Sequence, residues 1–180
     1  MKLIPALFAA VLAIAGGAGV YAYAQQRSAP PAQTERSQSA LERLRDWVMN
    51  ENGTERAFDN EYWDHHETGI YVEAETGEAL FVSTDKYDSG SGWPSFTRPV
   101  DPDNIILRED NAFGMRRIEV RSRRGNHHLG HVFDDGPRAS GGQRFCINSC
   151  AIRFIPRAQM EAQGYGRYLA LVDGAAQQAR

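Results

Sequence analysis

Residues 144–149 read Arg-Phe-Cys-Ile-Asn-Ser, and this stretch decides the fold because polar and apolar residues alternate along it. In a β-strand successive side chains point to opposite faces, so Arg144, Cys146 and Asn148 share one side. The two apolar residues between them then point the other way, into packing. The stretch therefore predicts a β-strand whose polar face carries a cysteine.

The surroundings of Cys146 favour a reactive thiol over a packed one. A thiol beside a guanidinium and a hydrogen-bond donor tends towards the thiolate, the nucleophilic form of cysteine. The alternative is structural, because cysteine is among the most frequently buried residues. Arg144 and Asn148, at two-residue spacing on either side, favour the reactive interpretation.

Composition indicates one ordinary globular domain. The chain has 180 residues, a formal net charge of -3 and 42% apolar residues, so we expect no nucleic-acid partner. Five arginines between Arg116 and Arg124 resemble a basic patch, but Glu119 and two apolar residues interrupt them. A solvated strand face is the better interpretation of that run.

The N-terminal segment predicts export. Residues 3–24 form an apolar run that follows Lys2 and ends Ala-Tyr-Ala, which is typical of a signal-peptidase site after Ala24. The run is also long enough to be an uncleaved membrane anchor, and a membrane partner is expected only in that case. We expect a periplasmic protein, with membrane anchoring through residues 3–24 as the alternative.

Four parts follow along the chain. Residues 1–24 are a signal peptide or membrane anchor, residues 25–36 a polar linker, residues 37–172 the folded domain, and residues 173–180 a tail.

Within the domain, a helix is expected over residues 37–47, with a serine as N-cap, and a short helix follows Pro156. Alternating apolar runs predict strands at residues 79–82, 104–107, 117–122, 131–133 and 144–154. The expected fold is mainly β and antiparallel, with small flanking helices.

Only two cysteines are present, Cys146 and Cys150, so no disulfide framework is expected. If the strand continues through both, four residues span roughly 13 Å. A disulfide needs Cα atoms within about 7 Å, so only a helical or sharply bent segment would bring the two thiols together.

Two other segments carry candidate chemistry. His128 and His131 are spaced like half of a zinc site, but they also suit proton transfer beside a thiolate, and Gly130 between them permits a β-bulge. Trp93 and Phe96 lie in a glycine-rich segment. They are typical either of a loop folded onto the core or of an aromatic floor for a methyl-bearing substrate.

Taken together, the ordered motifs resemble the peptide-methionine (R)-S-oxide reductases, the B family of methionine sulfoxide reductases. The similarity runs from about residue 41 to residue 171. The motifs that carry it are residues 51–56 (ENGTER), 61–66 (EYWDHH), 86–96, 128–137, 144–149 and 164–166 (GYG).

The resemblance implies two antiparallel sheets and a definite chemistry. Cys146 would attack the sulfoxide sulfur of methionine-R-sulfoxide, in oxidised proteins or peptides, and become a sulfenic acid. His131 and His128 would deliver a proton to the departing oxygen. The other implied roles are for Asn148, which would hold the reacting groups, and for Trp93 with Phe133, which would receive the substrate methyl group.

Two departures from the family pattern change the expected chemistry. Ser91 stands where many relatives have a resolving cysteine, so an external thiol, from a thioredoxin-like or other donor, should reduce the sulfenic acid. Cys150 is the alternative resolving residue. The positions of two zinc-binding Cys-x-x-Cys pairs hold other residues here, and no zinc or other cofactor is expected. These residues are Glu73, Thr76, Ser122 and Gly125.

Two other classes of function compete with the reductase. An exported module could bind oxidised methionine without turning it over, in which case Cys146 would be unreactive. A metal-dependent hydrolase could use His128 and His131 as ligands, in which case the protein would bind metal.

Overall fold

The computed structural model describes residues 31–174. The chain divides into two units, Met1–Ser39 and Ala40–Arg180, and the sheets and the candidate site belong to the second. The expected signal peptide or anchor, residues 1–24, lies outside the described residues. The four-part division of the chain stays a prediction.

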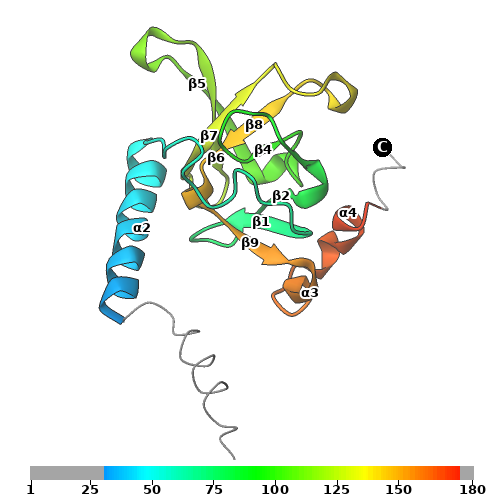
Figure 1. Ribbon diagram of the computed structural model, residues 1–180. Helices are drawn as coiled ribbons and strands as arrows, with labels where there is room; N and C mark the ends of the chain where they lie inside the picture. Colours follow the sequence, from blue (N-terminus) through cyan, green and yellow to red (C-terminus); the bar gives the residue numbers. More distant parts are fainter. Residues whose placement is uncertain (1–30, 175–180) are drawn as a thin grey trace, which may run out of the picture. The chain divides into compact units, whose positions relative to one another are not determined.

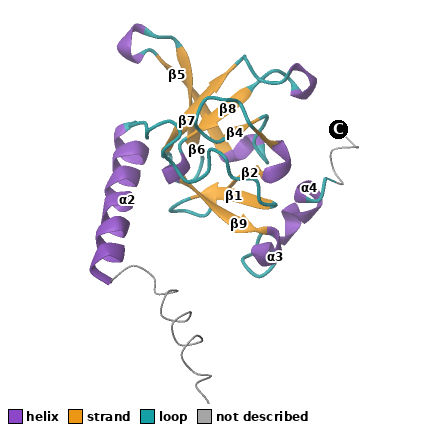
Figure 2. Ribbon diagram, viewed as in Figure 1, coloured by secondary structure: helices purple, strands orange, loops and turns teal. Residues whose placement is uncertain are grey.

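Two antiparallel sheets form the second unit (Figures 1 and 2). The smaller has the strand order β2-β1-β9, with β1 (Gly69–Glu73), β2 (Ala79–Val82) and β9 (Ile152–Pro156). The larger has the order β3-β4-β8-β7-β6-β5, with β3 (Lys86–Tyr87), β4 (Ser95–Phe96), β5 (Ile105–Asp110), β6 (Arg117–Ser122), β7 (His128–Phe133) and β8 (Arg144–Ile147). The prediction of a mainly β fold with two antiparallel sheets is confirmed.

Alternation along β8 produces the predicted two faces. Phe145 and Ile147 are buried in the main core, while Arg144 and Cys146 are half-buried on the opposite face. The hydrophobic effect favours this orientation, because burying each large apolar side chain contributes about 1.5–3 kcal/mol. The polar face of β8 is thereby left free for chemistry.

The expectation of one continuous strand over residues 144–154 is wrong. β8 ends at Ile147, a 3-10 turn follows over Ser149–Ala151, and β9 then joins the other sheet. Backbone N–H groups of the turn donate to the buried Glu55 carboxylate, which explains why the chain bends where apolar alternation suggested a strand. A disulfide between Cys146 and Cys150 would have required such a bend. Both cysteines are nevertheless free thiols.

Helix α2 (Pro31–Glu51) begins six residues before the expected serine. Proline is favoured in the first turn of a helix, and the alanine, glutamine, glutamate and arginine that follow have good helix propensity. Near its C-terminal end, Val48 and Met49 are fully buried in the main core. Two short helices, α3 (Arg157–Met160) and α4 (Leu169–Val172), flank the smaller sheet, and α3 confirms the helix expected after Pro156.

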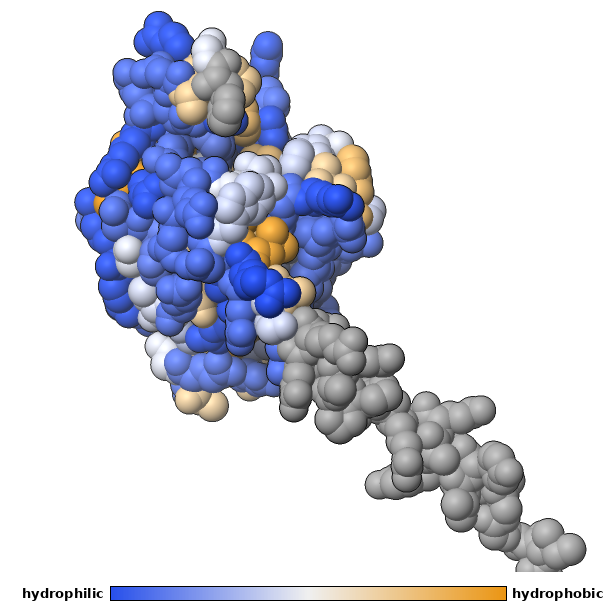
Figure 3. Space-filling view, turned by 90° about the vertical axis from the view of Figure 1, so that its left-hand side faces the viewer, coloured by the Kyte–Doolittle hydropathy of each residue, from blue (hydrophilic) through white to orange (hydrophobic). Residues whose placement is uncertain are grey.

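The face of the molecule in Figure 3 is mostly hydrophilic, with apolar residues in small patches. Among the described residues, no helix combines the length and the apolar character needed to cross a bilayer.

Candidate active site

Strands β7 and β8 bring the cysteine and a histidine together. His131 is directly paired with Cys146 across the antiparallel ladder, so both side chains lie on one face. Gly130 has a φ of +155°, and a Cβ there would lie 2.0 Å from the carbonyl oxygen of Cys146. Only glycine permits this close approach of the two strands.

The expected bulge in β7 is present, displaced by one residue. Val120 pairs with Gly130, whereas Arg121 pairs with His128, so Leu129 is the extra residue. A bulge changes which side chains face the same way. It therefore explains how two histidines three residues apart have their rings on the same side of the strand, with centroids 5.3 Å apart.

A pocket of about 140 Å³ opens over Cys146. It brings together five of the predicted site residues, and Arg117, Gly130, Thr54 and Ile147 complete its wall. The five are Cys146, His131, Asn148, Trp93 and Phe133. His128 and Cys150 do not line it.

Burial raises the pKa of the Cys146 thiol. The Ser91 hydroxyl, whose Oγ lies 3.8 Å from Sγ, and the Arg144 guanidinium both lower that pKa, but burial outweighs them. The expectation of a resting thiolate is therefore wrong, because the site that holds the thiol also removes it from water.

Arg144 fixes the aromatic wall beside the thiol. Its guanidinium donates two hydrogen bonds to Asp135, at 2.7 and 2.9 Å, and lies 4.4 Å from the centroid of the Phe133 ring. The two hydrogen bonds to one carboxylate fix the guanidinium, which then contacts the Phe133 ring through a cation–π interaction. Phe133 is thereby oriented towards the pocket.

The backbone of Glu55 connects the other two walls. Its carbonyl accepts a hydrogen bond of 3.1 Å from Nε1 of Trp93, and its N–H donates one of 3.0 Å to Oδ1 of Asn148. Asn148 also donates to the carbonyl of Leu129 at 3.1 Å. Both hydrogen-bonding ends of this amide are thus used to hold the pocket, and burial raises the pKa of the Glu55 carboxyl below it.

His131 belongs to a carboxylate–imidazole pair at the pocket wall. Oδ2 of Asp110 accepts a hydrogen bond from Nε2 of His131 at 2.8 Å and one from Arg117 at 2.6 Å. The N–H of Ala112 first, and His131 second, lower the pKa of Asp110 to about 2. Asp110 is therefore ionised near neutral pH and accepts the Nε2 hydrogen, which leaves Nδ1 of a neutral His131 as the acceptor nitrogen.

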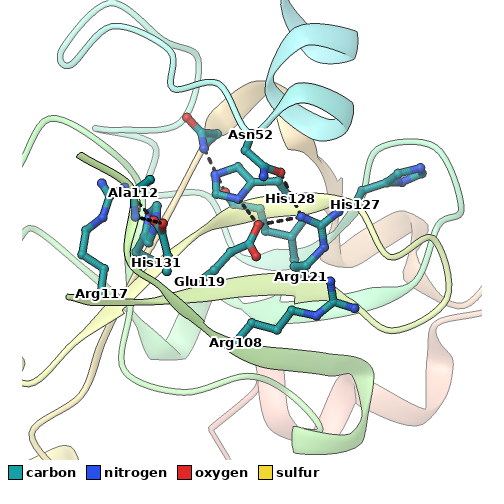
Figure 4. Close-up of polar contacts among 12 residues, drawn as sticks. Asn52, Arg108, Ala112, Arg117, Glu119, Arg121, His127, His128 and His131 are labelled. Carbon is teal, nitrogen blue, oxygen red and sulfur yellow. Dashed lines mark hydrogen bonds and ion pairs between the residues drawn. The ribbon is translucent and has the colours of Figure 1, made fainter. Parts of the chain in front are cut away.

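His128 belongs to a second such pair, inside the sheet. Its Nδ1 lies 2.8 Å from Oε1 of Glu119, which also accepts from Arg121 at 2.6 Å. Figure 4 shows Glu119 between His128 and Arg121, with His131 beside Arg117. The His128 side chain is 2% exposed, and its Nε2 is buried without a hydrogen-bond partner in the described structure. Burial lowers the pKa of both histidines.

The expected solvated face is wrong for two of the five arginines between Arg116 and Arg124. Arg121 has an 11% exposed side chain and Arg117 one of 25%, and each neutralises a carboxylate that holds a histidine. The alternation Arg117, Glu119, Arg121 on one face of β6 was a usable signal for this role. Asp110, at the end of β5, and Glu55, in a loop, carried no comparable pattern and were missed.

Cys150 is buried, and its backbone N–H donates a hydrogen bond of 3.0 Å to the Glu55 carboxylate. Burial first, and the Glu55 carboxylate second, raise the pKa of its thiol. Such a thiol is a poor nucleophile because little thiolate forms. The structure therefore gives this cysteine a packing environment.

Three of the four positions that hold zinc-binding cysteines in many relatives, those of Glu73, Thr76 and Ser122, belong to a hydrogen-bonded cluster with His127. Glu73, fully buried, accepts hydrogen bonds from the N–H of Thr76 and from His127, and Oγ of Ser122 accepts one from the His127 N–H at 3.0 Å. Burial raises the pKa of Glu73, but these bonds outweigh it and the net direction is down. In the part of the chain that the structure describes, no three His, Cys, Asp or Glu residues are placed to hold a metal ion. That no zinc is used stays a prediction.

Comparison with known proteins agrees with this geometry. The SelR domain family model matches residues 41–156. The chain belongs to this family. Over 137 residues it is 56% identical to a protein of Vibrio cholerae serotype O1 (strain ATCC 39315 / El Tor Inaba N16961) named peptide methionine sulfoxide reductase MsrA/MsrB. The resemblance to the methionine sulfoxide reductase B family is confirmed.

The alignment covers 76% of the chain and 36% of that relative. The chain thus spans about a third of the length of the curated protein it matches.

Proposed function

We propose that this SelR domain reduces methionine-R-sulfoxide in proteins or peptides to methionine, with Cys146 as the nucleophile. The observation that carries the proposal is the single pocket in which Cys146 lies with a histidine and two aromatic rings. Methyl and sulfur groups contact aromatic rings favourably, so Trp93 and Phe133 suit the substrate end. Family membership supports the same reaction.

The reaction balances with one thiol and one sulfoxide. Sγ of Cys146 attacks the sulfoxide sulfur, and the oxygen transfers to Cys146 as a sulfenic acid while methionine leaves. The sulfoxide is reduced by two electrons and Cys146 is oxidised by two. The proton of the resting thiol ends on the sulfenic acid, so no net proton is consumed in this step.

His131 is the group that handles that proton. With Nε2 committed to Asp110, its Nδ1 accepts the thiol proton as Sγ attacks and returns it to the oxygen as that oxygen becomes negative. A neutral histidine of lowered pKa accepts the proton only transiently, which suits a relay. Asn148, held at both ends of its amide, fixes the pocket wall around the reacting atoms.

Regeneration requires two equivalents of an external thiol. The first condenses with the sulfenic acid to give a mixed disulfide and water, and the second releases the Cys146 thiol and a disulfide product. Ser91, whose Oγ lies 3.8 Å from the sulfur, occupies the position from which a cysteine would reach it, and serine forms no disulfide. The burial of Cys150 also supports an external donor, of thioredoxin-like or other chemistry.

The location of the protein is proposed from its sequence. The apolar run of residues 3–24 supports export to the periplasm, or membrane anchoring if the run is not removed. Oxidised envelope proteins are then the substrates.

The test is reduction of both sulfoxide diastereomers with dithiothreitol as donor. We expect turnover of the R form alone, with complete loss in Cys146→Ser. Turnover that survives in Cys146→Ser would remove the nucleophile from the proposal, and stoichiometric binding without turnover would favour a binding module. With a protein thiol donor, Cys150→Ser should retain the wild-type rate, and a slower rate would make Cys150 the resolving residue.

A further inference from the structure

A second cavity, of about 480 Å³, adjoins the pocket over Cys146. The two share Arg117 and Phe133 in their walls, so they meet at these side chains. The smaller pocket, about 140 Å³, lies below the range of about 300–1,000 Å³ in which proteins hold whole small ligands. It accommodates the end of a side chain, and the rest of any substrate must lie outside it.

The second cavity lies where two hairpins diverge. β6 and β7 pair no further than Ile118 with Val132, whereas β5–β6 and β7–β8 each continue past that point. Figure 1 shows the two hairpins separating at the top of the view. We call this cavity the notch.

The notch reaches both faces of the sheet. Adjacent residues of a strand point to opposite faces, and both Arg117 and Ile118 of β6, with both Val132 and Phe133 of β7, line it. A chain that leaves the catalytic face past Phe133 can therefore continue between the hairpins onto the other face.

The chemistry of the notch suits a peptide segment. Its floor is apolar and consists of Val132, which is buried, and Ile118, which is 36% exposed. Its rim is polar and carries both signs of charge, with exposed Arg116 opposed by Glu109 and Asp134. An apolar floor with a polar rim is the pattern of surfaces that bind polypeptide.

We propose that the notch binds the polypeptide that flanks the oxidised methionine, with an apolar flanking residue against Ile118. This rests on the proposed function and assigns the notch to the residues that flank the oxidised methionine. The methionine side chain enters the pocket over Cys146, and the backbone continues past Arg117 and Phe133 into the notch.

The test compares two substrates, N-acetylmethionine-R-sulfoxide and a peptide in which leucines flank methionine-R-sulfoxide. The measured quantity is the ratio of kcat/KM for the peptide to kcat/KM for the acetylated amino acid. We expect the ratio to fall about tenfold in Ile118→Asp, mainly through KM of the peptide. Ile118→Thr, which keeps the β-branched shape and so favours folding, should lower the ratio less.

Leu107→Asp is the matched control, because Leu107 is an apolar residue of β5 that is 47% exposed and does not line the notch. It should leave the ratio unchanged. Equal ratios in all variants and the wild type would overturn the notch as a peptide site while leaving the reductase proposal intact. Failure of the wild type to reduce either substrate would instead overturn the proposed function.

Discussion

The two histidines of β7 each pair with a carboxylate that also binds an arginine, but they differ in how deeply they are buried. His131 pairs with Asp110, which also binds Arg117. It lines the pocket over Cys146 and has a 12% exposed side chain. His128 pairs with Glu119, which also binds Arg121, and the His128 side chain is 2% exposed. The proposed proton relay uses the first pair, because of the two imidazoles only that of His131 lines the pocket.

The difference shows how a β-bulge gives two histidines of one short motif different environments. Leu129, the extra residue in β7, allows both rings to occupy one side of the sheet, and His128 is the more buried of the two. Removing one partner of a buried imidazole–carboxylate pair strongly destabilises a protein. An imidazole that lines a pocket can accept a proton from a bound group and return it. The predictions below separate these two roles.

The largest expected effect is on turnover when His131 is replaced. His131→Asn removes the relay nitrogen, so kcat/KM for methionine-R-sulfoxide should fall about 100- to 10,000-fold, the usual contribution of general acid–base catalysis. Steady-state kinetics with dithiothreitol measures it. His66→Asn, at a histidine with a 67% exposed side chain, is the control and should retain the wild-type rate. A rate within threefold of wild type in His131→Asn would contradict the proposed relay.

The next largest effect is on stability, at the inner pair. Glu119→Ala leaves His128 and Arg121 buried without their carboxylate, which should lower the free energy of unfolding by about 3–5 kcal/mol. Asp110→Ala, at the more exposed pair, should cost about 1–2 kcal/mol. Urea denaturation of the two variants gives both values. Equal losses would contradict the division into a catalytic and a structural pair.

The sequence was sufficient for the sheet class and for five residues of the pocket, but not for the contacts that hold them. Alternation along β8 placed Cys146 correctly, and the motifs named Trp93 and Phe133. The resting state of the thiol was mispredicted because the cost of its burial depends on residues distant in sequence. Asp110 and Glu55 were missed for the same reason, since a partner 21 or 93 residues away leaves no local pattern.

Acid should destabilise the protein through both histidines. Burial lowers the pKa of each, so below an unfolded value of about 6.5 the unfolded chain binds more protons than the folded one. Stability is then fully present above about pH 6.5 and is lost as pH falls towards the folded values, by up to about 1.4 kcal/mol per pH unit for each histidine.

Urea denaturation between pH 7.5 and 5.5 measures this slope. His128→Gln should make it shallower, and more so than His131→Gln, because His128 is the more buried of the two. The wild-type slope is the reference for both variants. A steeper slope in either variant would show that its histidine is protonated in the folded protein.

The smallest effect is expected at Asn52, which reaches the inner pair only from outside. Its Oδ1 accepts a hydrogen bond of 2.9 Å from Arg121, and its φ of +59° ends helix α2 in the left-handed region. Asn52→Gly keeps that conformation and removes only an exposed bond, so it should lower the free energy of unfolding by about 0.5 kcal/mol. Asn52→Ala should cost about 1–2 kcal/mol more, from the left-handed strain. Neither variant should change kcat/KM, because Arg121 retains Glu119. A loss of rate in Asn52→Gly would show that the inner pair also supports catalysis, and the two pairs would then act as one network.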